Sequence, residues 1–564
     1  MMHSFGTLAA GTVFNPMVDK LVILRPEMAL FVGTVIVMIL GLSRSKVIRK
    51  SCAWISGLSL VVAGVLAYNT VVPEGTRGAL PGLMPFVKTL IAAVGVLLVM
   101  VLAGTVDRDF ELEIHRGRPF DAIRSNRSEF YAFFLFSLTG LMLCADADDL
   151  MWLFLALELT SLPTYVMVSI STARTRSQEA GVKYFFLGAM GAATFLYGFA
   201  MLYGVAGTTA LFGTPTNPGI AEVLAAQQAA GGLTSLALLG LVLSILGVSF
   251  KIAAVPMHFY TPDVYEGAAP GVSAFLAFVP KAAGFITLML LCSLVGWGAG
   301  GGSLPESIRV TLWVMAALTM TVGNVMAVLQ SSVKRILAYS SVAHSGYMLV
   351  GLIAGPGVAS AGNAAGAATD SSLASNGLAA TLFYLLCYGF MNLGTFAVLA
   401  CLERRRDPRT GGFEEVEAVD DLRGLWQTQP LLAVVMVLSS LSLLGFPILL
   451  GFWGKFYLFT SAISSGELLL VIIMGLNSAV GAFYYLRLVF APFLASRDER
   501  QEQAELTPFV SRIIAGVLSA ASVVALIYPA GKLMVACDKA TQYRAPQPAV
   551  ANTGAAASAQ PAGK

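Results

Sequence analysis

The sequence contains fourteen runs of about 20 mostly apolar residues, and no other feature limits its fold as strongly. A helix of that length crosses the hydrocarbon core of a bilayer, whereas core helices of soluble domains have shorter apolar stretches. The runs therefore predict an all-α polytopic membrane protein with about 14 transmembrane helices. They lie near residues 27–43, 52–72, 83–105, 128–145, 149–171, 178–206, 235–257, 270–298, 308–330, 334–355, 377–402, 429–461, 466–495 and 506–531.

Charged residues are too few to form the polar shell of a soluble globule. They make up 12% of the 564 residues, against about 25% in a typical soluble domain. This composition excludes a cytoplasmic enzyme, a nucleic-acid-binding protein and a disordered chain, and leaves the lipid bilayer as the surrounding medium. The net charge of +3 is also too small to indicate an anionic polymer as a partner.

The basic residues between the runs predict the orientation of the chain. Among the thirteen connections, the odd-numbered ones carry most of the Lys and Arg, and the even-numbered ones carry only Arg77, Lys88 and Arg309. Because short basic loops stay on the cytoplasmic side, the odd connections are predicted to be cytoplasmic and both termini periplasmic. At the start of the tenth run, Lys334 is expected to extend toward the lipid headgroups.

Two runs contain a proline deep in apolar sequence: Pro256 in the seventh and Pro447 in the twelfth. Proline removes a backbone hydrogen bond, and the carbonyls that it frees must find partners inside the protein or in a wet cavity. The breaks are five spans apart, and an odd number of spans inverts topology. Broken helices in inverted repeats are typical of transporters, so two inverted five-helix repeats are predicted. Short segments of the two halves are also weakly similar in sequence. Chance similarity between apolar segments is the alternative explanation for this.

These features divide the chain into five parts. Residues 1–127 form an N-terminal three-helix segment with a charged cytoplasmic loop, residues 128–298 the first repeat, and residues 308–495 the second repeat. Residues 506–531 form the last helix. The tail 541–564, rich in Ala and Pro, is predicted to be disordered.

Four ionisable residues lie within the apolar runs: Glu158, Lys251, Lys281 and Lys455. At a helix centre each costs roughly 2.5–3.5 kcal/mol, so together they cost about 10 kcal/mol unless they pair, hydrate or change protonation. Intramembrane ionisable groups usually mark a functional path, and a series of Lys and Glu at mid-depth suits a proton relay. A moving partner charge can load and unload the proton of a buried lysine. A static ion pair that fixes helix packing is the alternative.

Three further residues are weaker candidates for the relay. His344 lies among Ser and Tyr hydroxyls that could hold water, which favours a relay role. His258 follows Pro256 and could titrate near neutral pH, although a structural hydrogen bond explains it equally well. Lys183 lies near the start of the sixth run, where extension toward the headgroups is an adequate explanation.

Five acidic residues near the ends of runs are expected to lie in loops and turns. Two follow the first break and three form a predicted outside turn; they are Asp263 and Glu266, and Asp146, Asp148 and Asp149.

No sequence motif indicates a cofactor bound by this chain. The six cysteines form no C-x-x-C pair, so the clustered thiolates of an iron–sulfur or structural zinc site are missing, and they are expected to be small buried residues. There is no P-loop, dinucleotide-binding motif or nucleophile elbow. The chain is therefore expected to bind no metal and to carry no catalytic redox centre.

Three segments are distinctive: Phe250–Ala268 around the first proline, Val333–Ser341, and Gly451–Tyr457 after the second proline. They closely resemble segments of the antiporter-like membrane subunits of respiratory complex I. The resemblance covers roughly residues 125–495. It is strongest to the N type of these subunits, because Lys455 stands where the M type is expected to have a glutamate.

The resemblance implies roles for the buried charges of the first half. Glu158 resembles the fifth-helix glutamate that pairs with the lysine of the broken seventh helix, here Lys251. Lys183 resembles an auxiliary lysine near that pair, and Lys281 the central lysine that links two half-channels.

In the second half, His344 is placed like a polar bridge toward Lys455, which resembles the lysine of the outward exit path. The implied function is outward proton pumping in a prokaryotic inner membrane, driven by NADH:quinone electron transfer in partner subunits. NADH, FMN, iron–sulfur clusters and quinone would be bound by those partners, and M-type and K-type membrane subunits are the expected neighbours.

Two other functions stay open from the sequence. The same fold serves multi-subunit cation/proton antiporters and membrane-bound hydrogenases, which neighbouring genes would distinguish. A non-transporting scaffold is the third possibility, and four mid-membrane charges argue against it on energetic grounds.

Overall fold

The computed structural model describes residues 16–71, 78–107, 124–172, 174–214, 217–297, 304–357, 375–405, 413–494, 505–506 and 510–544, with a few single positions between 110 and 121. Most of the predicted tail 541–564 lies outside the described residues. The same is true of much of the charged loop 107–127 and of the connection 356–376.

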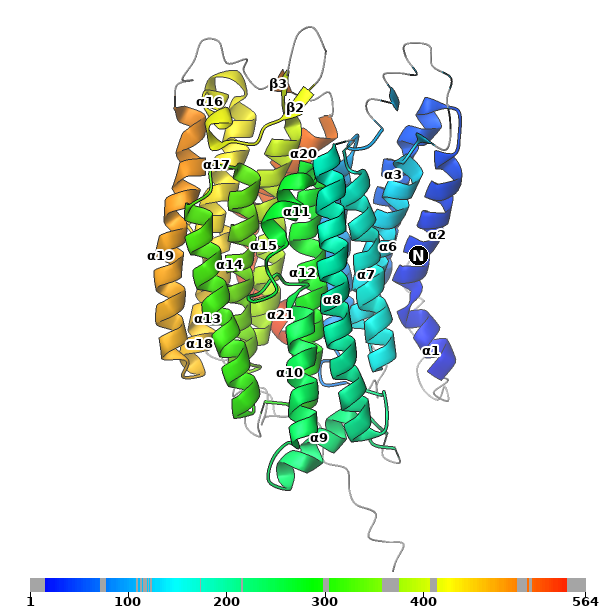
Figure 1. The fold of residues 1–564 in the computed structure, drawn as a ribbon, viewed down its shortest axis with the longest axis vertical. Coiled ribbons are helices and arrows are strands. Elements are labelled where there is room, and N and C mark those ends of the chain that lie inside the picture. The colour runs from blue at the N-terminus through cyan, green and yellow to red at the C-terminus, as the bar shows by residue number, and fades with distance from the viewer. Residues whose placement is uncertain are drawn as a thin grey trace, which may run out of the picture.

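Long, roughly parallel helices form one bundle (Figure 1). The apolar runs fold this way because a helix pairs its backbone N–H and C=O groups internally, as a lipid environment requires. The helices are α1 (Pro16–Ile23), α2 (Arg25–Gly41), α3 (Lys46–Tyr68), α4 (Leu83–Leu102), α6 (Arg127–Ala145), α7 (Leu150–Ile170), α8 (Thr175–Ala206), α9 (Ile220–Ala229), α10 (Ser235–Ser249), α11 (Thr261–Gly267), α12 (Pro270–Val295), α13 (Glu306–Val328), α14 (Val333–Ala354), α15 (Gly377–Cys401), α16 (Leu425–Thr428), α17 (Pro430–Leu444), α18 (Leu450–Ser464), α19 (Leu468–Phe490), α20 (Val510–Ala525) and α21 (Ala530–Ala540).

Among the described residues, ten helices are long and apolar enough to cross a membrane, or eleven if the bent pair α20–α21 counts as one span. This confirms a predominantly helical, multi-pass membrane protein, but helix length alone does not reach the predicted count of 14. The shortfall has a physical cause. Helix α2 has 17 residues, and α10 and α17 stop after 15 residues each, at the two proline-containing breaks.

A small antiparallel sheet, which the sequence did not predict, joins two of the connections at one end of the bundle. Its strands are β1 (Leu402–Arg405), β2 (Phe413–Glu415) and β3 (Glu505–Leu506), in the order β2-β1-β3. In register, Arg404 lies opposite Glu414, and Leu402 opposite Leu506. The sheet ties the connection after α15 to the one before α20 at the top of Figure 1.

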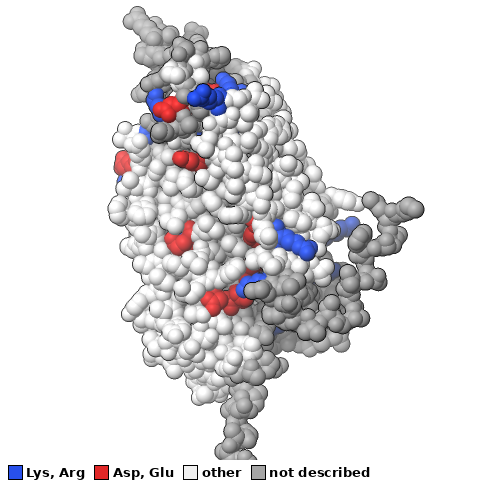
Figure 2. All heavy atoms as spheres, turned by 90° about the vertical axis from the view of Figure 1, so that its right-hand side faces the viewer, with Lys and Arg blue, Asp and Glu red and all other residues white. Residues whose placement is uncertain are grey.

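The helices of the bundle differ in how much surface they bury. The apolar windows of α12, α14 and α15 are buried along their whole length, whereas those of α3, α8 and α19 are only 28%, 33% and 33% buried. Exposed apolar side chains on the outer helices are normal in lipid, where no hydrophobic penalty applies. Seen from the side of α1–α4, much of the surface is uncharged, and the charged side chains gather in a few groups (Figure 2).

Helices α8 and α10 pack with their backbones in close contact. A Cβ atom on Gly198 would lie 2.6 Å from the backbone nitrogen of Ser244, and one on Gly247 would lie 2.3 Å from that of Phe195. Only glycine permits so close an approach, a common device between membrane helices. The contact fixes the position at which α10 ends inside the bundle.

The expected extension of Lys334 toward the headgroups is wrong. Its side chain is buried and donates to the carbonyls of Ala268 at 2.8 Å and Glu266 at 3.5 Å. These carbonyls lie at the C-terminal end of α11, where the helix dipole favours a cation. Lys334 therefore caps α11.

The expectation that Asp263 and Glu266 are loop charges is wrong. Both residues lie on α11, in an ion-pair cluster. Glu266 binds Arg176 of α8 at 2.6 Å and Arg335 of α14 at 2.8 Å, and Asp263 binds Arg335 at 3.2 Å. The guanidiniums of Arg335 and Arg176 offset the cost of burying the Glu266 carboxylate. We call these four residues the α11 cluster; it connects α11 to both halves of the bundle.

The glycine contact predicts that Gly198→Ala weakens the fold while Gly204→Ala on the same helix does not. An added Cβ at Gly198 collides with the backbone of α10, whereas nothing lies within 4 Å of one at Gly204. We expect a loss of about 1–3 kcal/mol for the first variant, the usual cost of overpacking. Thermal unfolding of the purified full chain in detergent measures the difference, and equal melting temperatures would contradict the close contact.

The α11 cluster predicts that Glu266→Gln weakens the fold. The substitution removes the ion pairs of Glu266 with Arg176 and Arg335, and we expect the variant to be less stable by about 1 kcal/mol at pH 7. Melting temperatures of the variant and wild type test this, and equal values would contradict a stabilising role of the cluster. Glu306→Gln is the control, because Glu306 pairs with Arg309 at the surface.

Candidate functional site

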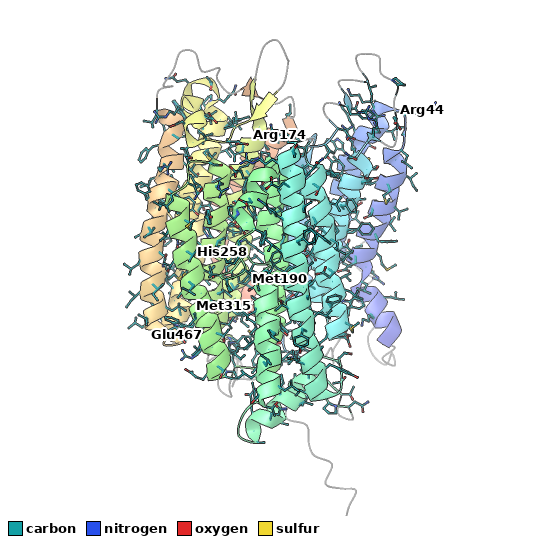
Figure 3. All side chains as sticks on the ribbon, in the orientation of Figure 1. Arg44, Arg174, Met190, His258, Met315 and Glu467 are labelled. Carbon is teal, nitrogen blue, oxygen red and sulfur yellow. The ribbon has the colours of Figure 1, made fainter. Side chains whose placement is uncertain are left out.

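The first break in the helices lies between α10 and α11, over residues 250–260, and contains Pro256. His258 belongs to this segment and lies about midway along the bundle in Figure 3, between the ends marked by Arg174 and Glu467. The chain between α10 and α11 therefore loses its regular helical hydrogen bonds about midway along the bundle.

The carbonyls freed by this break have partners within the protein. The Phe250 carbonyl accepts from the Tyr260 hydroxyl at 2.9 Å. The Ile252 carbonyl accepts from Lys281 Nζ at 3.3 Å and from the Ser345 hydroxyl at 2.5 Å. Side chains from α12 and α14 thus replace the missing helical donors, as a lipid environment demands.

Glu158 and Lys251 meet at the start of the break. Lys251 Nζ lies 3.4 Å from Glu158 Oε1 and also donates to the hydroxyl of Ser161, one turn further along α7. The side chain of Lys251 is 2% exposed and that of Glu158 is 18% exposed. Lys251 is therefore a buried cation with one charged and one neutral acceptor, and Glu158 is the more accessible partner.

Lys281 lies in the middle of α12 and is bound only by neutral oxygens among the described residues. Besides Ile252, its ammonium donates to the Ser341 carbonyl and, at 2.6 Å, to the Ser345 hydroxyl. A Cβ at Gly284, one turn away, would lie 2.5 Å from Ile252 Cγ2. This close approach lets α12 bring Lys281 against the break.

His344 lies on α14, next to the residues that bind Lys281, and forms hydrogen bonds with two tyrosines. Its Nδ1 lies 2.6 Å from the Tyr384 hydroxyl, and its Nε2 lies 2.7 Å from the Tyr485 hydroxyl, which also bonds to Ser340. Because both ring nitrogens have a hydroxyl partner, a proton can be held on either one. Ser345, the next residue, bonds to Lys281, so the two sites are adjacent.

Lys455 lies at the second break, between α17 and α18. Its ammonium donates to the carbonyls of Leu443 at 3.1 Å and Leu444 at 2.8 Å, the last two residues of α17, and to the Ser478 hydroxyl at 3.3 Å. Gly445 ends the helix with φ of +93°, a conformation that favours glycine. Pro447 lies in the short segment that follows, and the break is thus closed by a lysine, like the first one.

Lys183 and His258 lie apart from these contacts. Lys183 is half-exposed on α8 and pairs with Glu179 at 2.8 Å and Asp263 at 3.2 Å. Within the described part of the chain, no ion pair or hydrogen bond joins it to Glu158 or Lys251. His258 is half-buried, and its ring packs against Phe259.

Several residues of the site were not predicted from the sequence. The hydroxyls that link the lysines and the histidine come mostly from residues far apart in sequence, so no local motif signals them; they are Ser161, Tyr384, Ser478 and Tyr485. Only the hydroxyls next to His344 on its own helix were visible as a pattern.

A second group of buried charges was not predicted from the sequence. It shows that the expectations for Lys88 and Asp146 were wrong. Lys88, counted among loop residues, is wholly buried on α4. It pairs at 2.7 Å with Asp146, which was expected only to mark an outside turn, and at 2.8 Å with Glu27. Lys88 lies inside the run predicted as the third span, 83–105, although the sequence analysis counted it among the residues of a loop.

Lysines and a histidine held by hydroxyls and carbonyls can bind and release protons. Among the residues that the structure describes, no three His, Cys, Asp or Glu gather as metal ligands, and all six cysteines are buried free thiols.

Comparisons with known proteins agree with this arrangement. The family described as "NADH:quinone oxidoreductase/Mrp antiporter, TM" matches residues 147–481. The chain is 36% identical to NADH-quinone oxidoreductase subunit N of Trichlorobacter lovleyi, over 88% of this chain and 92% of the relative. It is 33% identical to subunit N 1 of Solibacter usitatus, over 94% and 99%.

Solved structures share the fold. A chain of respiratory complex I from Thermus thermophilus aligns with a TM-score of 0.68 and 29% identity, covering 91% of this chain and 99% of that one. A chain of the Mrp complex from Dietzia aligns with a TM-score of 0.67 over 93% and 97%, at 17% identity, which shows the fold alone. With a family match over more than half of its length and relatives above 30% identity nearly end to end, this chain belongs to the NADH:quinone oxidoreductase/Mrp antiporter family of membrane proteins.

Proposed function

We propose that this chain is a proton-translocating membrane subunit of NADH-quinone oxidoreductase. The observation that carries the proposal is the pair of broken helices, closed by the buried lysines Lys281 and Lys455, with His344 between these two lysines. The relatives named subunit N support it, because the chain spans nearly their whole length.

The proton path that we infer begins at the Glu158–Lys251 pair. Separation of the two charges would make the ammonium of Lys251 less stable, since burial penalises a charge without a partner. The proton released there passes to Lys281, whose acceptors include the carbonyl of Ile252, the residue next to Lys251. Lys183 is assigned an auxiliary electrostatic role and His258 a secondary one, at the margin of this path.

In the second half, His344 bridges Lys281 and Lys455. Its two tyrosine partners can pass a proton by exchanging donor and acceptor roles. Tyr347, three residues further along α14, has its ring 5.2 Å from Lys455 Nζ, which places the exit lysine beside the same helix. Lys455 would release the proton toward the periplasm.

The architecture that we infer has 14 spans. It adds to the ten long helices α2 as a span, and the pairs α10–α11, α17–α18 and α20–α21 as one span each. Spans 4–8 (128–298) and 9–13 (308–495) would form the inverted repeats, with 1–127 as the N-terminal segment and 506–531 as the last helix. The basic loops support a prokaryotic inner membrane with both termini in the periplasm.

Electron transfer is assigned to other subunits. NADH, FMN, iron–sulfur clusters and quinone would bind there, and this chain would act as a non-redox part of the translocase. We expect M-type and K-type subunits as its neighbours, and the exposed apolar faces of α3, α8 and α19 offer surfaces for lipid or for such helices.

A second candidate function is a subunit of a multi-subunit cation/proton antiporter or a hydrogenase-like membrane complex. The fold match to the Mrp complex, and to the archaeal membrane-bound sulfane sulfur reductase at a TM-score of 0.70 and 20% identity, favours it. Genes for the other subunits beside this one separate the two candidates.

The relay predicts that Lys251→Arg and Lys281→Arg abolish coupled transport even though both keep a positive charge. Arginine stays protonated, so it preserves a static ion pair but cannot release a proton. Since a positioned proton-transfer group contributes about 100-fold or more, we expect proton pumping through this subunit to fall by at least about tenfold. The measurement is deamino-NADH-driven pumping by the assembled complex in membrane vesicles.

Lys20→Arg is the matched control, because Lys20 pairs with Asp148 at the surface. Wild-type pumping in both relay variants would show that Lys251 and Lys281 only hold the helices together. Loss of pumping in Lys251→Ala and Lys281→Ala, with wild-type pumping in the two arginine variants, would also show a purely structural role.

A further inference from the structure

A group of three ionisable side chains is buried among the N-terminal helices, away from the proposed relay. Lys88 Nζ of α4 lies 2.8 Å from Glu27 Oε1 of α2 and 2.7 Å from Asp146 Oδ2, the residue after α6. It also donates to the Ile23 carbonyl at 2.9 Å. We call Glu27, Lys88 and Asp146 the outer triad; its three side chains are 6%, 0% and 3% exposed.

The outer triad lies at the end of the bundle opposite the small sheet. Helix α2 begins there beside α1, and α6 ends there (Figure 1); α4 begins there too, because Lys88 near its start contacts Glu27 and Asp146. Within the described residues, no ion pair or hydrogen bond connects the triad to Glu158, Lys251 or Lys281. It is therefore a separate group, on the side that the basic loops assign to the periplasm.

The charges of the outer triad do not balance. Two carboxylates and one ammonium sum to −1 when all three are ionised, and a net charge is strongly disfavoured in a buried site. One oxygen of each carboxylate lies within 2.8 Å of Lys88 Nζ. The other oxygens, Glu27 Oε2 and Asp146 Oδ1, are buried and accept no hydrogen bond within the described part of the chain.

Charged residues near the outer triad do little to balance its net negative charge. At this end of the bundle, the other described charged side chains on α1, α2, α21 and the connection between α6 and α7 are Lys20, Arg25, Asp148, Asp149, Lys532, Asp538 and Lys539. Lys20 and Asp148 pair with each other at the surface, at 3.0 Å. Asp149 accepts from Met151 N and the Thr209 hydroxyl, and Asp538 accepts from Asn376. Burial raises the pKa of Asp146 well above the usual range; Lys88 opposes this and Glu27 adds to it.

We propose that the outer triad is a proton-binding site, in which Glu27 and Asp146 share one proton that exchanges with the outer aqueous phase. A proton neutralises the group and gives the unpartnered oxygens a donor. A metal cation fits less well, because the ammonium of Lys88 already lies within 2.7–2.9 Å of three oxygens, where such an ion would sit. Water reaches the neighbouring Asp148, whose side chain is 58% exposed.

The test uses the full chain in lipid nanodiscs. Infrared difference spectra recorded during a pH titration follow the C=O stretch of a protonated carboxyl, and D2O shifts that band if the proton exchanges. Wild type is expected to show one protonated carboxyl at neutral pH that both Glu27→Gln and Asp146→Asn remove. Asp148→Asn, the exposed control, should leave it unchanged. Melting temperatures of the two triad variants are expected to equal or exceed that of wild type, since the Lys88 pair stays neutral.

Three results would overturn the proposal. A band absent from wild type, or retained in either triad variant, means that both carboxylates are ionised or that no proton is shared. A band that disappears when NaCl replaces choline chloride identifies a sodium site. A band that does not shift in D2O shows a trapped proton. Lys88→Met supplies an independent check, because two carboxyls without a cation should show two protonated groups in place of one.

Discussion

Unpaired backbone carbonyls in an apolar medium are the constraint on which the arrangement of this molecule depends. Helices α10 and α17 both stop inside the bundle, and each stop leaves carbonyls that lipid cannot satisfy. At both breaks the donor is a lysine ammonium: Lys281 at the first and Lys455 at the second. The close packing at Gly284 and Gly247, and the burial of α12, α14 and α15, serve to keep these donors in place.

The same contact explains why a lysine can be both structural and functional. A carbonyl stabilises an ammonium without neutralising it, so the lysine keeps its hydrogen bonds but not a fixed charge state. A neutral lysine still has two N–H donors for the carbonyls. The bundle can thus tolerate both protonation states, whereas a carboxylate in contact with Lys281 would favour one of them.

Patterns local in sequence predicted most of the fold and part of the site. The apolar runs located the long helices, and Pro256 and Pro447 located both breaks, because these signals act on neighbouring residues. Contacts across the bundle were not visible. Tyr384 and Tyr485 reach His344 from other helices, and Lys334 was misjudged because its partner, the end of α11, lies 66 residues away. Lys88 differs from the surface lysines in that it is buried and pairs with two carboxylates. The composition of the sequence does not show which charges pair.

The order of α7, α12, α14 and α18 across the bundle has an electrical consequence (Figure 1). Glu158, Lys281 and His344 each lie near the middle of a long helix, and these helices run roughly parallel, so a line through the three residues runs across the bundle rather than along it. In the relay that we propose, charge moving along this line would cross almost none of the transmembrane voltage, which does work of about 2.3 kcal/mol per charge and 100 mV on motion across the bilayer. Opposing voltage would then act on uptake and release at the two ends, and would leave the lateral transfer between the two halves nearly unaffected.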